Sequence, residues 1–365
     1  MAITGCMYAF QEEIKAFYQP YIYVEPQQKA FLPPSQLREI ADAQVPGKHI
    51  HGILYKGKHN AVNAIYYMED EYYDFVYLNP YTGEVLKVKN ELTDFFRFVL
   101  NGHFYLWLPH DIGRPVVASF TLIFIVMLIS GIVLWWPKNK FSIKQRFTVK
   151  WDARWRRKNY DLHNVTGFYI CWLALIFAVT GLVWGFEWFA KGYYGIASGG
   201  KKLLPYDEPL SDYSARNNSY DMPVIDKLWY KMQEEHPEAK SIEMHFPHDD
   251  KTSIMAAINP EESTYYKTDH RYFDQYTMAE LSVDHQWGRY LELSAANKLM
   301  RMNYDIHVGA ILGLPGKILA FFISLLIASL PVSGFMIWYG RRNKEKKAPA
   351  KSINKVIAYS EVRSA

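Results

Sequence analysis

The stretch VVASFTLIFIVMLISGIVLWW, at residues 116–136, contains no charged side chain. About 20 consecutive apolar residues make a helix long enough to cross the hydrocarbon core of a bilayer. Two further runs of this kind cover residues 165–188 and 318–339. Hydrophobic residues make up 50% of the chain, yet its mean hydropathy is slightly negative, at -0.18. The sequence therefore predicts a membrane protein that combines a few spans with sizeable polar domains.

Basic residues gather beside the spans. Residues 138–158 carry nine Lys or Arg against one Asp, and residues 341–365 carry eight against two acidic residues. Cytoplasmic segments next to spans are enriched in Lys and Arg, so both segments are predicted to face the cytoplasm. The remaining sequence is acidic and is predicted to lie outside. Because the basic runs adjoin spans, they indicate contact with membrane lipid and argue against a nucleic-acid partner.

Several common functional motifs are absent from the sequence. The two cysteines, Cys6 and Cys171, both lie in apolar segments and form neither a disulfide framework nor a CxxC metal site. No CxxCH occurs, which excludes covalently attached c-type haem, and no GxGxxG, P-loop or GxSxG motif is present. The chain therefore has no recognisable nucleotide site or hydrolase nucleophile.

The polar parts of the chain form a repeat. YLNPYTGEVL at residues 77–86 matches YFDQYTMAEL at residues 272–281, and each ends a strand-like aromatic run in a turn that begins with Asn or Asp. An amphipathic helical pattern precedes each copy, at residues 34–50 and 224–242. Each half of the chain is therefore predicted to carry a small α+β domain.

The span ends repeat as well. SGIVLWW at residues 130–136 matches SGFMIWY at residues 333–339, and ITGCMYAFQEEIK at residues 3–15 matches VTGLVWGFEWFAK at residues 179–191. Met1 is therefore expected to lie within the outer half of a first span. The predicted fold is a membrane protein with a four-helix α-helical transmembrane bundle, its first helix truncated. Both α+β domains lie outside, in a tandem repeat related by a pseudo-twofold axis.

This reading divides the chain into alternating spans and polar segments. The predicted parts are a remnant of the first transmembrane helix (1–15), a first α+β domain (16–100), a second transmembrane helix (101–137), a basic cytoplasmic loop (138–161), a third transmembrane helix (162–190), a second α+β domain (191–303), a fourth transmembrane helix (304–340) and a basic cytoplasmic tail (341–365).

Two histidines occupy equivalent places in the two inward-going spans. His103 lies 28 residues before Gly131, and His307 lies 27 residues before Gly334. At about 1.5 Å per residue this length exceeds the bilayer core, so both are predicted to lie at the outer side, on bent segments. Neutral imidazole is a standard axial ligand of haem iron. The pair is predicted to bind one haem between the halves, with the bends supplied by Pro109, Pro115 and Pro315.

His163 begins the third span on the cytoplasmic side, 18 residues before Gly181. Its repeat equivalent falls upstream of Met1, where a fourth ligand is expected. His110, 21 residues before Gly131, is an alternative to His103. A histidine at a span boundary also serves as an interfacial hydrogen-bonding residue, which is the competing interpretation for each of these positions.

Two weaker candidates for metal binding lie in the polar domains. His245 and His248, in HFPH, would share one face if that segment were helical, although it adjoins a predicted strand. His49 and His51, in GKHIHG, alternate as residues of a strand do. Surface histidines without a metal are the alternative for both motifs.

The motifs together resemble one known family. LNPYTGEVL, the span endings SGIVLWWPK, TGLVWG and SGFMIWYGR, and the histidine segments GHFYLWL, YDLHNVTG and DIHVGAILG resemble the PepSY-associated transmembrane family of bacterial inner-membrane proteins. The resemblance covers essentially the whole chain. It implies that both α+β domains are PepSY-like and periplasmic and that the C-terminus is cytoplasmic. The family includes FoxB-type ferrisiderophore reductases, in which four helices bind two b haems and reduce iron carried by a periplasmic chelator.

The resemblance implies a haem-dependent oxidoreductase for iron uptake. His103 and His307 would be axial ligands of the outer haem b iron, and His163 would be one ligand of the inner haem b. The implied partners are a ferric siderophore and an unidentified electron donor. Two alternatives are a membrane-anchored PepSY binding or regulatory protein without haem, and a haem electron carrier to a different periplasmic acceptor.

Overall fold

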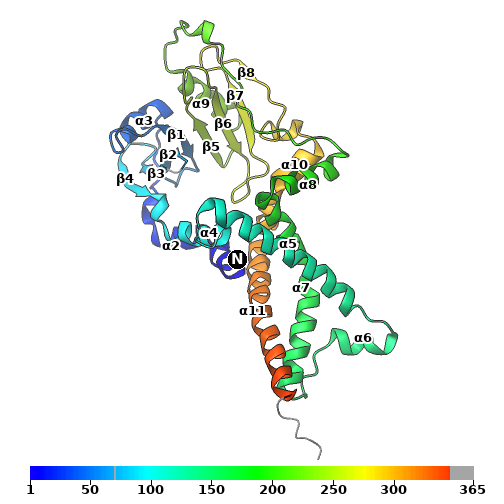
Figure 1. Cartoon of the computed structure of the whole chain (residues 1–365). Coiled ribbons are helices and arrows are strands. Elements are labelled where there is room, and N and C mark those ends of the chain that lie inside the picture. The colour runs from blue at the N-terminus through cyan, green and yellow to red at the C-terminus, as the bar shows by residue number, and fades with distance from the viewer. Residues whose placement is uncertain (70, 346–365) are drawn as a thin grey trace, which may run out of the picture. The chain divides into compact units, whose positions relative to one another are not determined.

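The computed structural model of the chain describes residues 1–69 and 71–345. They form two compact units, one made of residues 1–128 and 173–325 and the other of residues 129–172 with the chain from residue 326 onward. The predicted basic tail covers residues 341–365, and its part from residue 346 onward lies outside the described residues. Figure 1 shows the strands of the first unit gathered together.

Strands from both halves of the chain form one antiparallel sheet. Its order is β4-β3-β2-β1-β5-β6-β7-β8, so the two sets of four strands meet where β1 pairs with β5. Gly52 is paired with His245, and Tyr55 with Ile242, along this contact. The strands are β1 (Ile50–Tyr55), β2 (Val62–Met68), β3 (Tyr72–Leu78), β4 (Val85–Asn90), β5 (Ser241–His245), β6 (Ile254–Asn259), β7 (Asp269–Phe273) and β8 (Glu280–Leu281).

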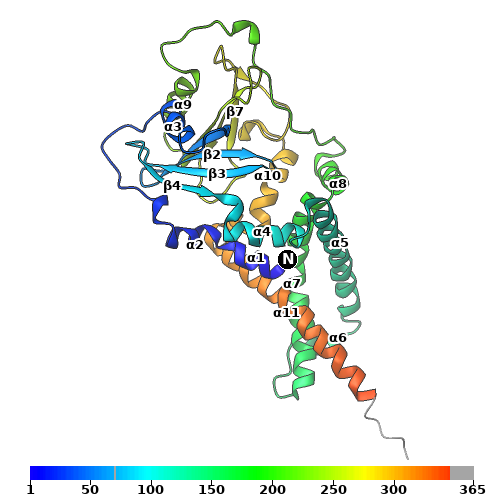
Figure 2. The same ribbon diagram turned by 60° about the vertical axis from the view of Figure 1, so that its left-hand side comes forward.

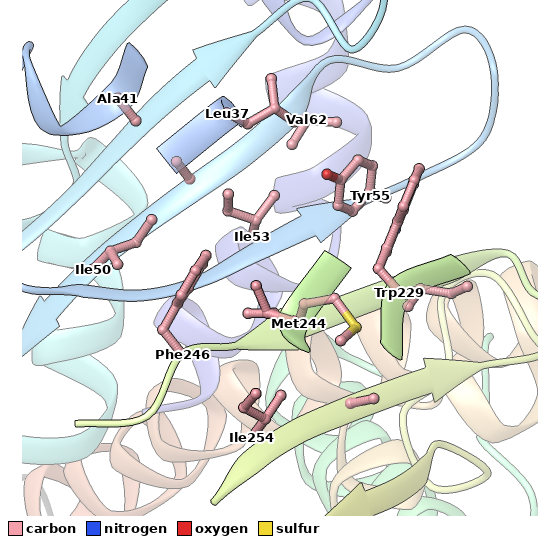
Figure 3. Packing of buried hydrophobic residues seen from close by; sticks show 14 of the residues in the cluster. Leu37, Ala41, Ile50, Ile53, Tyr55, Val62, Trp229, Met244, Phe246 and Ile254 are labelled. Carbon is pink, nitrogen blue, oxygen red and sulfur yellow. The ribbon is translucent and has the colours of Figure 1, made fainter. Parts of the chain in front are cut away.

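One helix from each half packs on the same face of the sheet. These are α3 (Pro34–Asp42) and α9 (Val224–Glu235), and each precedes the four strands of its own half. Leu37 of α3, Trp229 of α9 and Met244 of β5 are at most 1% exposed and belong to one hydrophobic core, part of which Figure 3 shows. The core therefore extends across the contact between the two halves.

The repeated turn motif folds in the same way in both copies. The backbone N–H of Gly83 donates to the Asn79 carbonyl at 2.9 Å, and that of Met278 donates to the Asp274 carbonyl at 3.0 Å. Both Gly83 and Met278 have a positive φ, of 76° and 61°. The Asn79 and Asp274 side chains also accept hydrogen bonds from the following backbone, as such residues do in turns. The predicted Asn/Asp turns are confirmed, and the tandem repeat of the whole chain stays a prediction.

Among the described residues, three helices are long and apolar enough to cross a membrane, which confirms the three predicted apolar spans. They are α5 (His110–Trp135), α7 (Trp155–Gly185) and α11 (Gly313–Glu345). Between the first two, α6 (Lys140–Phe147) lies in the predicted basic loop.

The helices predicted over residues 101–137 and 304–340 are each interrupted. In the first, α4 (Phe95–Tyr105) ends before Leu106 and Trp107, whose φ values of 53° and 57° are left-handed. In the second, α10 (Ala295–His307) ends before Gly309, whose φ is 79°. These left-handed residues stop helix propagation.

Of the three prolines expected to supply bends, Pro109 lies in a break, between α4 and α5, and the other two lie within helices. Pro109 precedes α5, and its carbonyl accepts the first helical hydrogen bonds, from the N–H groups of Ile112 and Gly113 at 3.0 and 2.8 Å. Pro115 lies inside α5, and Pro315 lies in the first turn of α11. The expectation that both histidines lie beyond a straight span is confirmed.

Two other predicted helices have bounds that differ from those expected. The third span, predicted over 162–190, begins earlier, at Trp155, and ends at Gly185 because Phe186 is extended, with φ −130° and ψ 127°. Helix α8 (Glu187–Ser198) follows as a separate helix. Residues 1–15 fall in α1 (Ala2–Ala9) and α2 (Gln11–Tyr18), which are separated at Phe10. Helix α1 lies alongside α4 (Figure 2).

Candidate functional site

His103 and His307 lie at the ends of two short helices, and their rings are close together. His103 belongs to the last turn of α4, and His307 is the last residue of α10. Their ring centroids are 6.1 Å apart, with an angle of 70° between the ring planes. Residues that are 204 positions apart in the sequence thus form one pair, because the two breaks turn both helix ends toward the same place.

Hydrogen bonds assign the proton of the His103 ring to Nδ1. This nitrogen lies 3.1 Å from the Met1 carbonyl oxygen and 3.2 Å from Thr4 Oγ1. A carbonyl oxygen only accepts hydrogen bonds, so Nδ1 is the donor. In a neutral imidazole the other nitrogen, Nε2, then carries a free lone pair.

The same reasoning applies to His307. Its Nδ1 lies 2.9 Å from Thr180 Oγ1, and the Thr180 hydroxyl donates its proton to the Ile176 carbonyl at 2.7 Å. The hydroxyl oxygen is therefore the acceptor for Nδ1, which leaves Nε2 of His307 unprotonated. Burial lowers the pKa of both His103 and His307 to about 4, so both rings are neutral at neutral pH.

A glycine beside each hydroxyl residue lets the imidazole approach the helix backbone. A Cβ placed on Gly5 would lie 3.4 Å from Cε1 of His103, and one placed on Gly181 would lie 3.1 Å from Cε1 of His307. The second distance is tighter than ordinary van der Waals contact. Each ring is thus held by a Thr-Gly pair, with the hydroxyl on Nδ1 and the glycine under the ring edge.

His163 shows this arrangement a third time. In α7, its Nδ1 lies 2.9 Å from Ser333 Oγ, and a Cβ placed on Gly334 would lie 3.2 Å from its Cε1. Three of the four Ser/Thr-Gly pairs that the span repeat aligns therefore carry a histidine. At the fourth glycine, Gly131, an added Cβ would meet no described atom within 4 Å. The sequence alignment identified the four pairs, but it did not show that the hydroxyl groups of three of them would form hydrogen bonds with histidines.

His110 does not take part in the pair. It is the first residue of α5, and its side chain is 57% exposed. Its ring packs against Tyr105, with centroids 5.0 Å apart, and its Nδ1 is 3.6 Å from a carboxylate oxygen of Asp111. Of the two alternatives, the geometry places His103 opposite His307.

The four histidines of the GKHIHG and HFPH motifs come together in an unexpected way. His245 lies in β5 and not in a helix, so the helical interpretation of HFPH is wrong. His51 of β1 packs against His245, with ring centroids 4.5 Å apart, and His49 packs against His248, at 4.9 Å. Two motifs that were separate in the sequence thus meet at the contact between β1 and β5.

The outer histidine pair has the donors and the spacing that a haem iron requires. Two imidazoles that bind one metal ion from opposite sides, each with a nitrogen about 2 Å from the metal, have ring centroids about 6 Å apart. The separation of 6.1 Å between His103 and His307 agrees with this value. Both rings are neutral and have their protons on Nδ1, so Nε2 is the donor on each side. The residues present fit haem.

Three candidate spans and an α+β sheet define a multi-pass membrane protein. The chain belongs to the family described as the PepSY-associated TM region, which matches residues 1–341. No curated protein matches the chain.

Proposed function

We propose that this chain is a b-haem protein of the bacterial inner membrane that moves electrons across it to reduce a ferric siderophore in the periplasm. The neighbouring rings of His103 and His307, 6.1 Å apart and with both protons on Nδ1, are the observation that carries the proposal. Membership of the PepSY-associated family supports it. The proposal makes the protein an oxidoreductase.

The histidines divide between two cofactor positions. His103 and His307 would hold the outer haem b, and His163 would supply one ligand of the inner haem b. Haem held by these histidines would supply one-electron redox chemistry. Hydrogen bonds from each Nδ1 fix the ring orientation and increase the electron donation from Nε2.

Aromatic side chains complete the outer position. The ring of Trp184 is 5.5 Å from that of His307, and the ring of Phe177 is 6.2 Å from it, centroid to centroid. Asn303, which is 1% exposed, donates from Nδ2 to the Thr180 carbonyl at 2.9 Å and ties α10 to α7. These contacts restrict water and hold His307 in register with Thr180.

A ferric siderophore is a suitable acceptor because hard oxygen donors hold ferric iron more tightly than ferrous iron. Adding one electron to the bound iron therefore weakens the chelate and frees the metal. In the proposed orientation the basic segment at residues 138–158 is cytoplasmic and the sheet is periplasmic. Electrons would enter from a donor on the cytoplasmic side.

The test is the haem content of the purified full chain and of four variants. A pyridine haemochrome assay and a reduced-minus-oxidised spectrum are recorded for the unmodified chain and for His103→Ala, His307→Ala, His163→Ala and His110→Ala. We expect the first two variants to lose the same outer haem and the third to affect only the inner one. The matched control, His110→Ala, retains the full content because its ring is exposed and lies outside the pair.

Unchanged haem in His307→Ala would refute the ligand assignment. Absence of b haem from the unmodified chain would favour a membrane-anchored binding protein instead. The acceptor is tested separately: reduced protein is mixed anaerobically with a ferric trihydroxamate, and reoxidation is followed together with trapping of ferrous iron. Haem that is not reoxidised by the chelate would point to another periplasmic acceptor.

A further inference from the structure

The contact between β1 and β5 brings three metal-binding side chains together. His51, Glu243 and His245 have ligand atoms that all lie within 4.8 Å of one another. They come from the two halves of the chain, and none of them takes part in the outer histidine pair. The His245 Nε2 is 3.3 Å from a carboxylate oxygen of Glu243.

A β-bulge directs His51 toward this place. The pairing of β1 with β2 shifts between Ile50 and Gly52, so His51 is the extra residue of the bulged strand. Ile50 and Ile53 are both buried in the core, three positions apart, which strict alternation along a strand would not allow. The bulge leaves His51 against His245 on the neighbouring strand, and bulges commonly re-aim a side chain in this way.

Gly52 leaves space for the carboxylate. A Cβ placed on Gly52 would lie 3.4 Å from the Glu243 Oε1 and 3.0 Å from the Met244 carbonyl oxygen. Any larger residue there would therefore crowd Glu243. The glycine, the bulge and His51 lie on β1, and Glu243 and His245 lie two positions apart on the paired strand β5.

We infer that His51, His245 and Glu243 bind one divalent first-row transition-metal ion. The separation of 3.3 Å between His245 and Glu243 equals the distance between two donors that share one metal at about 2.1 Å. The His51 side chain is exposed and closes the remaining distance by rotating about its own bonds.

The donor set selects the class of ion. Two imidazoles and one carboxylate suit Zn²⁺ and Fe²⁺ and are poor ligands for Mg²⁺ or Ca²⁺, which prefer oxygen. Three protein ligands leave coordination positions open to water or another molecule. Binding of Zn²⁺ is independent of the proposed function. Occupancy by ferrous iron rests on it, because reduction of a ferric chelate would supply that ion.

The test is a titration of the full chain in detergent, with any affinity tag removed and bound metal stripped by a chelator. ZnSO₄ is added in a calorimeter, and a second arm uses ferrous sulfate under anaerobic conditions. We expect about one Zn²⁺ per chain and at least about tenfold weaker binding in His245→Gln, Glu243→Gln and His51→Gln. His51→Gln changes an exposed side chain, so it tests the site without endangering the sheet.

The matched control is His248→Gln. His248 pairs with His49 and does not belong to the cluster of His51, Glu243 and His245. The variant should bind Zn²⁺ as the unmodified chain does. The inference is overturned if the unmodified chain shows no saturable Zn²⁺ binding, or if His51→Gln and His245→Gln bind as tightly as it does. Binding of Zn²⁺ but not of ferrous iron would retain the site and reject ferrous iron as its occupant.

Discussion

Replacing Thr180 by valine removes a single hydroxyl from the outer histidine pair. The Thr180 side chain is 4% exposed, and its oxygen accepts the His307 Nδ1 proton at 2.9 Å while donating to Ile176. In Thr180→Val the shape of the side chain is kept, and Nδ1 loses this acceptor. His307 itself, with its Nε2, remains in place.

The size of the effect follows from this one bond. Loss of a hydrogen bond to a metal-binding histidine typically costs 10 to 100-fold in affinity. The Phe177 carbonyl also supports the His307 proton, so we expect the lower end, about tenfold weaker haem binding. The bond strengthens electron donation to iron and favours the ferric state. A tenfold change in the ferric-to-ferrous affinity ratio corresponds to about 59 mV, so the outer haem potential should rise by up to about 60 mV.

Redox potentiometry of the purified chain, combined with a haem-transfer assay, measures both quantities. Thr121→Val is the matched control, since the Thr121 hydroxyl donates to the Val117 carbonyl at 2.8 Å within α5 and is not bonded to a histidine. A Thr180→Val protein with the potential and haem affinity of the unmodified chain would refute the role of the hydroxyl. An equal shift in Thr121→Val would refute it as well.

Two further substitutions test other contacts. Gly181→Ala should displace the His307 ring and lower the haem content, because the added Cβ would lie 3.1 Å from Cε1 of His307. Gly131→Ala is the control and should keep its haem, because the space around Gly131 is open. Equal haem content in both variants would contradict the close approach of the His307 ring to Gly181. Asp226→Ala should destabilise the sheet domain by about 2–3 kcal/mol, because it removes the acceptor of the Ser35 N–H and Oγ hydrogen bonds, at 2.9 and 2.5 Å. Chemical unfolding followed by circular dichroism measures this change, and a difference below about 0.5 kcal/mol would show that the bonds add no net stability.

The parts of the fold that depend on local pattern could be predicted from the sequence. Long apolar runs identified the three spans, and the Asn or Asp that starts each turn motif identified the strand ends. The helix break at residues 106 and 107 could not be predicted, because it depends on tertiary packing. Trp107 folds back over Gly102 and donates from Nε1 to the Phe98 carbonyl at 2.9 Å. That contact compensates for left-handed backbone at two residues that rarely adopt it.

The candidate site was predicted in part for a similar reason. Symmetry between the halves pointed to His103 and His307, and their rings lie 6.1 Å apart in the structure. The hydroxyl partners were missed, since the bonded residues are 99, 127 and 170 positions apart in the sequence. Likewise, no local pattern indicates that His51 would meet His245, because their contact depends on which strand edges of the two halves pair.

The pairing of β1 with β5 limits how this chain can be divided. Each of these strands would be an edge strand if its half were expressed alone, with a row of unsatisfied N–H and C=O groups beside an exposed part of the core. Because β1 and β5 pair antiparallel and each begins the four strands of its half, the exposed edge of one half resembles the edge of the other half with which it pairs. A single half produced on its own would therefore tend to self-associate through that edge, and fragments meant for separate study need an extended peptide supplied in place of the missing strand.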